Sequence, residues 1–165
     1  MNMMAHAMIS VLLIGIGATL TFDLWGYLLK QSFNIPSSNI CLVGRWVRYM
    51  PGGVFTHANI AASPPKSAEC QAGWMAHYLI GVTFAGIFVA IMGAQWVEHP
   101  TLVPAVVFGV VTTLAPFLIM QPAFGFGMAA SRSANPVQAR IRTVMNHIAF
   151  GFGLYVFGLL ANWLL

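Results

Sequence analysis

Four long apolar runs, separated by shorter segments that contain proline, glycine or charged residues, dominate the chain. They cover residues 5–29, 73–96, 101–121 and 136–164. A helix that crosses a bilayer needs about 20 predominantly apolar residues, and each of these runs is that long or longer. The pattern therefore predicts a single all-α integral membrane domain with four transmembrane helices.

Helix-start and helix-stop signals sharpen two of these spans. Pro100 precedes the third run and Pro116 lies inside it, where a residue without an N–H should kink the helix or free a carbonyl group. The fourth run opens with Asn135 and Pro136, which is the order expected of an N-cap and a first helical position.

A shorter helix is predicted inside the first long loop, residues 31–72. The N-cap candidates are Ser37, Ser38 and Asn39, and Pro51 begins a stop signal. Between them apolar residues recur every fourth position at Leu42, Trp46 and Met50. This spacing is typical of an amphipathic helix that lies on the membrane surface. The alternative is an ordinary turn packed under the bundle.

Composition supports a membrane location. The chain has 165 residues, of which 59% are hydrophobic and 6% charged, whereas soluble domains contain about 25% charged residues. The net charge of +4 comes from basic residues that flank the apolar runs, and this placement favours an orientation signal over nucleic-acid binding. We expect four of them to contact lipid phosphates or small anions: Arg45, Arg48, Arg132 and Arg140.

The basic residues also predict orientation. All seven fall on one side of the predicted topology: Lys30, Arg45, Arg48, Lys66, Arg132, Arg140 and Arg142. Under the positive-inside rule this side, including loop 31–72, faces the cytoplasm and both termini face outward. Cys41 and Cys70 lie in that loop, where thiols stay reduced, so the sequence predicts no structural disulfide.

Ionisable residues inside the apolar runs are the candidates for chemistry. Asp23 is the sole charged side chain between residues 7 and 29, and His77 and His147 lie in two other runs. Counted along the helices, each lies about 6–9 Å inside the cytoplasmic end, so the three could form one polar layer. Thr112 and Gln121 add polar groups from the third run.

Several functions are possible for this predicted polar layer. Intramembrane Asp and His are usual parts of proton relays and ion pathways, which favours binding or transport of a small molecule or ion. A structural polar core is the plain alternative. His77 and His147 could instead bind haem as axial ligands, and the N-terminal Met3 and His6 could bind copper. No cofactor is required by the sequence, and the absence of a nucleophile with a matching base disfavours an enzyme.

Several stretches resemble a family of small bacterial integral membrane proteins called domain of unknown function 2938. They include GIGATLTFDLW, CLVGRW, GWMAHYLIG, FGMAASRSANP and HIAFGFGLY. The resemblance implies a bacterial inner-membrane location and no established activity. We expect a homo-oligomer or a subunit of a larger membrane complex, because 165 residues are few for a complete transport path. A purely accessory, non-catalytic subunit is the leading alternative to transport.

Overall fold

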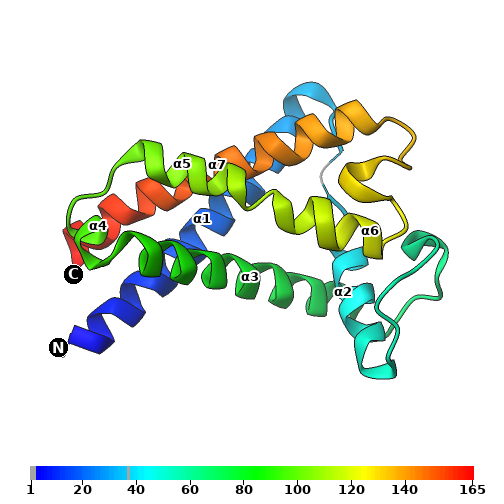
Figure 1. Cartoon of the computed structure of the whole chain (residues 1–165), viewed down its shortest axis with the longest axis horizontal. Coiled ribbons are helices and arrows are strands. Elements are labelled where there is room, and N and C mark those ends of the chain that lie inside the picture. The colour runs from blue at the N-terminus through cyan, green and yellow to red at the C-terminus, as the bar shows by residue number, and fades with distance from the viewer. Residues whose placement is uncertain (1–2, 37) are drawn as a thin grey trace. The chain divides into compact units, whose positions relative to one another are not determined.

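The computed structural model describes residues 3–36 and 38–165, and the regular structure in these ranges is helical throughout (Figure 1). Within these ranges, four helical stretches are long and apolar enough to cross a membrane: Ala5–Phe33, Glu69–Met92, Leu102–Ala123 and Pro136–Leu164. The predicted fold class, all-helical with four helices of membrane-spanning length, is therefore confirmed. The elements in chain order are α1 (Met3–Phe33), α2 (Ile40–Tyr49), η1 (Met50–Gly52), η2 (Ile60–Ala62), α3 (Glu69–Met92), α4 (Ala94–Glu98), α5 (Leu102–Val111), η3 (Pro116–Met120), α6 (Gln121–Ala123), η4 (Met128–Ala130) and α7 (Pro136–Leu164).

The second span differs from its predicted bounds at both ends. It begins at Glu69, four residues before the predicted start, and ends at Met92. The end follows from Gly93, whose φ of 80° lies in the left-handed region that glycine adopts without steric cost. The chain then forms the short helix α4, which contains Trp96, the predicted last residue of the span.

Proline disturbs the third span as predicted. Pro116 has no N–H to donate, and the chain forms a turn at residues 112–113 and a π-helical segment, η3, at Pro116–Met120. The carbonyl group of Thr112 accepts a hydrogen bond from the N–H of Ala115 (3.2 Å), one residue earlier than an α-helix would place the donor. The helix continues past the interruption to Ala123.

Two helix starts follow the predicted capping residues. The Asn135 side chain accepts a hydrogen bond from the N–H of Gln138 (3.2 Å) at the start of α7. The Asn39 side chain accepts from the N–H of Cys41 (3.1 Å) at the start of α2. The short helix predicted inside the first loop therefore exists; its position on a membrane surface stays a prediction.

In the structure Cys41 and Cys70 form a disulfide bond, so the prediction that these two cysteines form no disulfide is wrong. The compartment alone does not decide whether two cysteines bond, because the close approach of α2 and α3 brings these two together. A Cβ atom added to Gly44 of α2 would overlap the carbonyl oxygen of Glu69, and one added to Gly73 of α3 would overlap that of Ile40. Two glycines therefore allow backbone contact, and the Cα atoms of the two cysteines lie 4.0 Å apart.

The chain divides into two compact units. Unit 1 contains residues 1–37, 78–111 and 146–165, and unit 2 contains residues 38–77 and 112–145. The core of unit 1 is a cluster that includes Ile14, Ala85, Phe88, Ala105 and Leu154, whereas unit 2 has a small core of Ile60, Ala123 and Phe124.

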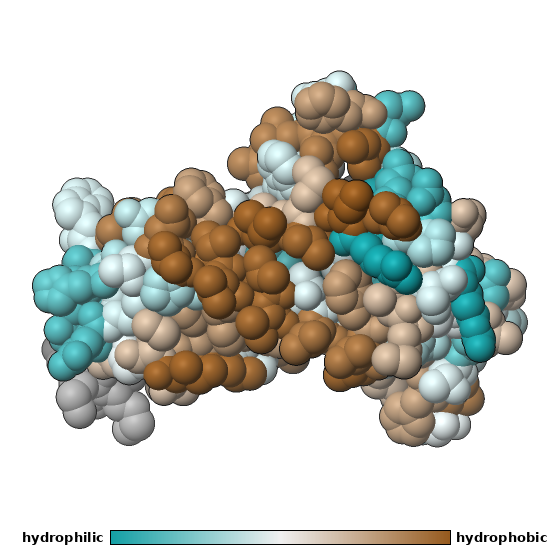
Figure 2. Space-filling view, turned by 45° about the horizontal axis from the view of Figure 1, so that its top comes forward, coloured by the Kyte–Doolittle hydropathy of each residue, from teal (hydrophilic) through white to brown (hydrophobic). Residues whose placement is uncertain are grey.

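Much of the outer surface is apolar, and Figure 2 shows broad hydrophobic areas on one face. On α1 the exposed side chains Leu12, Ile16, Leu20 and Leu24 recur every fourth residue, while Ile14 and Ala18 are fully buried. This period matches one face of a helix turned to the core and another turned outward. An outward face of leucine and isoleucine is suited to contact with lipid tails.

Candidate functional site

The close approach of α1 and α3 within unit 1 sets the surroundings of Asp23. A Cβ atom added to Gly15 would lie 2.5 Å from the Cα atom of Val82, and one added to Gly81 would overlap the side-chain oxygen of Thr19. Small residues at such crossings let membrane helices pack backbone to backbone. The pairing of residue 15 with 82 and of residue 19 with 81 fixes an antiparallel register, which brings the next turn of α1, with Asp23, beside residue 78 of α3.

Asp23 receives a hydrogen bond at this point. The hydroxyl group of Tyr78 donates to Oδ2 of Asp23 at 3.0 Å, and both side chains are half-buried. A carboxylate in a membrane span is costly and is expected to have a partner of this kind. Tyr78 was missed by the sequence analysis, although it lies on the α3 stripe that includes Gly81 and the fully buried Ala85, which marks the face packed against neighbours.

The threonines near Asp23 bond within their own helix. The hydroxyl of Thr19 donates to the carbonyl oxygen of Gly15 (2.8 Å), and that of Thr21 donates to the carbonyl oxygen of Gly17 (2.9 Å). These bonds satisfy hydroxyl groups in an apolar surrounding without a partner from another helix.

His147 of α7 also belongs to unit 1. Its half-buried ring packs edge-on against Phe22, with ring centroids 5.8 Å apart. Phe22 directly precedes Asp23 in α1, so the structure brings two members of the predicted polar layer to one region of α1. Close packing of α7 supports this placement, because a Cβ atom on Gly153 would lie 2.7 Å from the Cα atom of Ala18.

His77, the third predicted member, is the last residue of the first segment of unit 2. It is half-buried, and its ring lies 6.0 Å from that of Trp74, one turn earlier on α3. His77 directly precedes Tyr78, and successive residues of a helix point about 100° apart. The two side chains therefore leave α3 in different directions.

Gln121 and Thr112 lie in unit 2 and are buried, 7% and 6% exposed. The amide nitrogen of Gln121 donates to the hydroxyl oxygen of Thr143 at 3.3 Å. Its amide oxygen is buried and has no hydrogen-bond partner in the part of the chain that the structure describes. Gln121 follows directly on η3, so the disturbance at Pro116 determines where this side chain lies.

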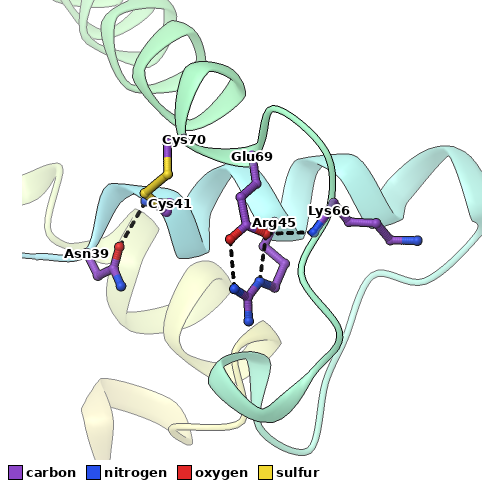
Figure 3. The surroundings of a disulfide bond; sticks show 6 residues. All are labelled: Asn39, Cys41, Arg45, Lys66, Glu69 and Cys70. Carbon is purple, nitrogen blue, oxygen red and sulfur yellow. Dashed lines mark hydrogen bonds and ion pairs between the residues drawn. A yellow bond between two sulfur atoms is a disulfide. The ribbon is translucent and has the colours of Figure 1, made fainter.

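Arg45, one of the predicted lipid contacts, has protein partners for all three of its guanidinium nitrogens. Nε and Nη2 donate to the two carboxylate oxygens of Glu69 at 2.8 and 2.7 Å, as Figure 3 shows. Nη1 donates to the carbonyl oxygens of Ile60, Ala61 and Ser63. The hydrogen bond to Glu69 raises the pKa of Arg45 above its ordinary value. The bridge needs both ions, so it is present at neutral pH and is lost either in strong acid, where the Glu69 carboxylate is protonated, or in strong base, where Arg45 loses its proton.

The other three predicted anion contacts, Arg48, Arg132 and Arg140, have exposed side chains. Arg140 also donates from Nε to the carbonyl oxygen of Ala129 at 2.8 Å, which ties the start of α7 to η4. Their contact with lipid or anions stays a prediction.

The candidate metal and haem ligands lie on different helices, His6 on α1, His77 on α3 and His147 on α7. No group of three or more His, Cys, Asp or Glu side chains suited to a metal ion occurs among the residues described here. His6 lines a shallow hollow of about 180 Å³ in unit 1 together with Val97, Glu98, Asn162 and Leu165. The side chain of Met3 lies outside the described part.

Comparison with protein families identifies a family for most of the chain. A family model described as "Protein of unknown function (DUF2938)" matches residues 12–161. The comparisons with curated proteins and with solved structures give no match.

Proposed function

The chain belongs to the family of proteins of unknown function DUF2938, and from its geometry we propose that it binds and moves a proton or a small monovalent cation through a membrane site built on Asp23. The hydrogen bond from Tyr78 to Asp23, 3.0 Å long and half-buried between two apolar helices, carries this proposal. We assign His147, whose ring packs against Phe22 in the same unit, to the pathway as well.

The chemistry of the pair suits reversible occupation. An ionised carboxylate only accepts hydrogen bonds, whereas a protonated one can also donate, and a tyrosine hydroxyl can donate or accept. The Tyr78–Asp23 bond can therefore persist in both protonation states of Asp23, with the roles of donor and acceptor exchanged. Small cations likewise take carboxylate and hydroxyl oxygens as ligands.

A purely structural role explains the pair less well. Hydrogen bonds between membrane helices contribute only about 0.6–2 kcal/mol, and a carboxylate inside a span carries a desolvation cost that a neutral side chain in the same place would not. Close packing at Gly15 and Gly81 already holds α1 to α3. A site that must bind a charge gives a reason for the aspartate that packing does not.

We place the protein in the bacterial inner membrane with both termini in the periplasm. The seven basic residues support this orientation through the positive-inside rule, with loop 31–72 in the cytoplasm. Arg48 and Arg132, both exposed, are then available to lipid phosphates. We further propose that the protein acts as a homo-oligomer or within a membrane complex, since four spans enclose little volume.

Ion flux into vesicles tests the proposal. Purified protein is reconstituted with an internal dye for H⁺, Na⁺ or K⁺, and an inward gradient of each ion is applied in turn. We expect one of the three to enter faster than into protein-free vesicles, and Asp23→Asn to reduce that rate by at least about tenfold, the factor that corresponds to 1.4 kcal/mol.

Glu98→Gln is the matched control, because it removes one carboxylate from an exposed position in the short helix α4. We expect it to keep the wild-type rate. Absence of flux for all three ions, or equal flux in wild type and Asp23→Asn, would contradict the proposed function.

A further inference from the structure

Cys41 and Cys70 occupy equivalent places in two helices that meet within unit 2. Each is the second residue of its helix, Cys41 in α2 and Cys70 in α3, and Figure 3 shows the bond between them. The N-terminus of a helix stabilises negative charge, so both cysteines lie where a thiolate is favoured over a thiol. Cys70 is exposed and Cys41 half-buried, which makes the Cys70 sulfur the accessible one.

A second connection runs beside the disulfide. One turn after Cys41, Arg45 forms the bidentate salt bridge with Glu69, the residue before Cys70. The remaining guanidinium nitrogen of Arg45, Nη1, donates hydrogen bonds to the carbonyl oxygens of Ile60, Ala61 and Ser63. These bonds, together with the Gly44–Gly73 approach, keep α2 against α3 when the covalent bond is broken. Reduced cysteines would therefore remain side by side, ready to be oxidised again.

The proposed orientation bears on whether the bond between Cys41 and Cys70 is permanent. It places loop 31–72 in the cytoplasm, where structural disulfides are rare and those that do form are usually transient or redox-sensing. A structural disulfide would also be redundant with the Arg45–Glu69 bridge.

We propose that Cys41 and Cys70 form a reversible thiol–disulfide exchange site on the cytoplasmic side. The proposal rests on the orientation given above and is independent of ion transport. The oxidant is a low-molecular-weight disulfide: the Cys70 thiolate attacks it, forms a mixed disulfide and releases one thiol. The Cys41 thiolate then attacks the Cys70 sulfur, forms the Cys41–Cys70 bond and releases the second thiol. The protein loses two protons and two electrons, and the small disulfide is reduced to two thiols; a dithiol reverses the reaction.

The redox state in living cells tests this directly. Cells that express the full chain are quenched with acid, and free thiols are labelled with a maleimide-linked polymer that retards the protein on a gel. We expect two labelled thiols in untreated cells, none after a brief exposure to a thiol oxidant, and two again after a membrane-permeant dithiol is added. A protein that is oxidised in untreated cells, or whose thiols stay reduced after the oxidant, would overturn the exchange site.

Two variants separate the possible failures. Cys41→Ser leaves Cys70 as the remaining cysteine, and we expect a membrane-impermeant maleimide to label it only after the cells are permeabilised. Labelling of Cys41→Ser in intact spheroplasts would overturn both the orientation and the exchange site. If Cys41→Ser is labelled only after permeabilisation but the wild type stays oxidised in every condition, the orientation holds and the exchange site alone is overturned. The variant Cys41→Ser/Cys70→Ser should show no shift in any condition and should remain folded in the membrane.

Discussion

Different interactions stabilise the inside of each of the two units of the chain. In unit 1, helices meet through glycines, alanines and apolar side chains, and the Asp23–Tyr78 hydrogen bond lies within this apolar packing. In unit 2, a small apolar core is accompanied by a disulfide, a bidentate salt bridge and side-chain bonds to loop carbonyls. Polar groups therefore stabilise the fold of unit 2, whereas the carboxylate of Asp23 in unit 1 needs another explanation.

Unit 2 contains irregular backbone, and this explains its polar bonds. Between α2 and α3 the chain runs for nineteen residues with only two short 3₁₀ segments, so many carbonyl groups have no partner from a regular helix. Arg45, Trp46 and Tyr49 of α2 supply donors to carbonyl oxygens of that loop. The helices of unit 1 satisfy their own backbones, so a carboxylate there serves no such need.

The largest effect on the free energy of unfolding is expected when the Arg45–Glu69 salt bridge of unit 2 is broken. Arg45→Leu leaves the part-buried Glu69 carboxylate without its cation, and we expect a cost of about 3 kcal/mol, the lower end of the range for loss of one partner of a buried ion pair. Arg48→Leu on the same helix changes an exposed side chain and should cost less than about 0.5 kcal/mol. Thermal unfolding in detergent compares Arg45→Leu with Arg48→Leu. Equal stability of the two variants would show that the salt bridge does not stabilise unit 2.

The packing of unit 1 should be almost as sensitive to one added methyl group. A Cβ atom on Gly151 would lie 2.7 Å from the carbonyl oxygen of Ala105 and 2.8 Å from the Cα atom of Val106. Gly151→Ala therefore forces α5 and α7 apart and should cost about 1–3 kcal/mol. At Gly86 the nearest atom is a methyl group of Val11 at 3.6 Å, so Gly86→Ala should be neutral or slightly stabilising. The same unfolding assay would contradict close α5–α7 packing if both variants behaved alike.

Reduction of the disulfide should have a smaller effect than loss of Arg45. The bond closes a loop with a sequence separation of 29 residues, and such bonds contribute about 2–4 kcal/mol. Since the Arg45–Glu69 bridge persists, we expect the lower end of that range, and a reduced protein that is still folded. To test this, a dithiol is added to the wild type and to Arg45→Leu, and the loss of helicity on reduction is compared. The wild type should keep its helicity, and Arg45→Leu should lose more helicity than the wild type.

The smallest stability effect is expected at the tyrosine of the candidate site. Tyr78→Phe removes one hydrogen bond to a carboxylate and should lower stability by about 1 kcal/mol. Ion flux should fall far more than this stability loss implies, because the tyrosine orients the binding group. Tyr27→Phe is the control, since Tyr27 is exposed on α1 and bonded to Gln31, and it should change neither property. A Tyr78→Phe variant with full flux would reduce the pair to a structural contact.

The sequence predicted what depends on local pattern. Apolar run length located the four long helices, Pro116 located the break in the third, and Asn135 located the start of the fourth. Each of these signals is read within one helical turn or one run. For the same reason the short helix α2 could be recognised from its cap and its apolar spacing.

The sequence did not predict what depends on the register between segments. Tyr78 reaches Asp23 because Gly15 and Gly81 fix how α1 meets α3, and neither glycine states its partner. The bridge of Arg45 with Glu69 and the bond of Cys41 with Cys70 likewise follow from contact at Gly44 and Gly73. Depth counting placed Asp23, His77 and His147 at one level, but depth does not specify which side chains face one another.

Protonation of Asp23 tests the central claim most directly. Infrared difference spectra between alkaline and acidic pH, recorded on the reconstituted full chain, detect the carbonyl band of a protonated carboxyl group. We predict one component of this band in wild type that is absent in Asp23→Asn, shifted in Tyr78→Phe and unchanged in Tyr27→Phe; the other carboxyl groups of the chain give the rest of the band. An identical spectrum for wild type and Asp23→Asn would contradict the claim that Asp23 is a reversible cation-binding group.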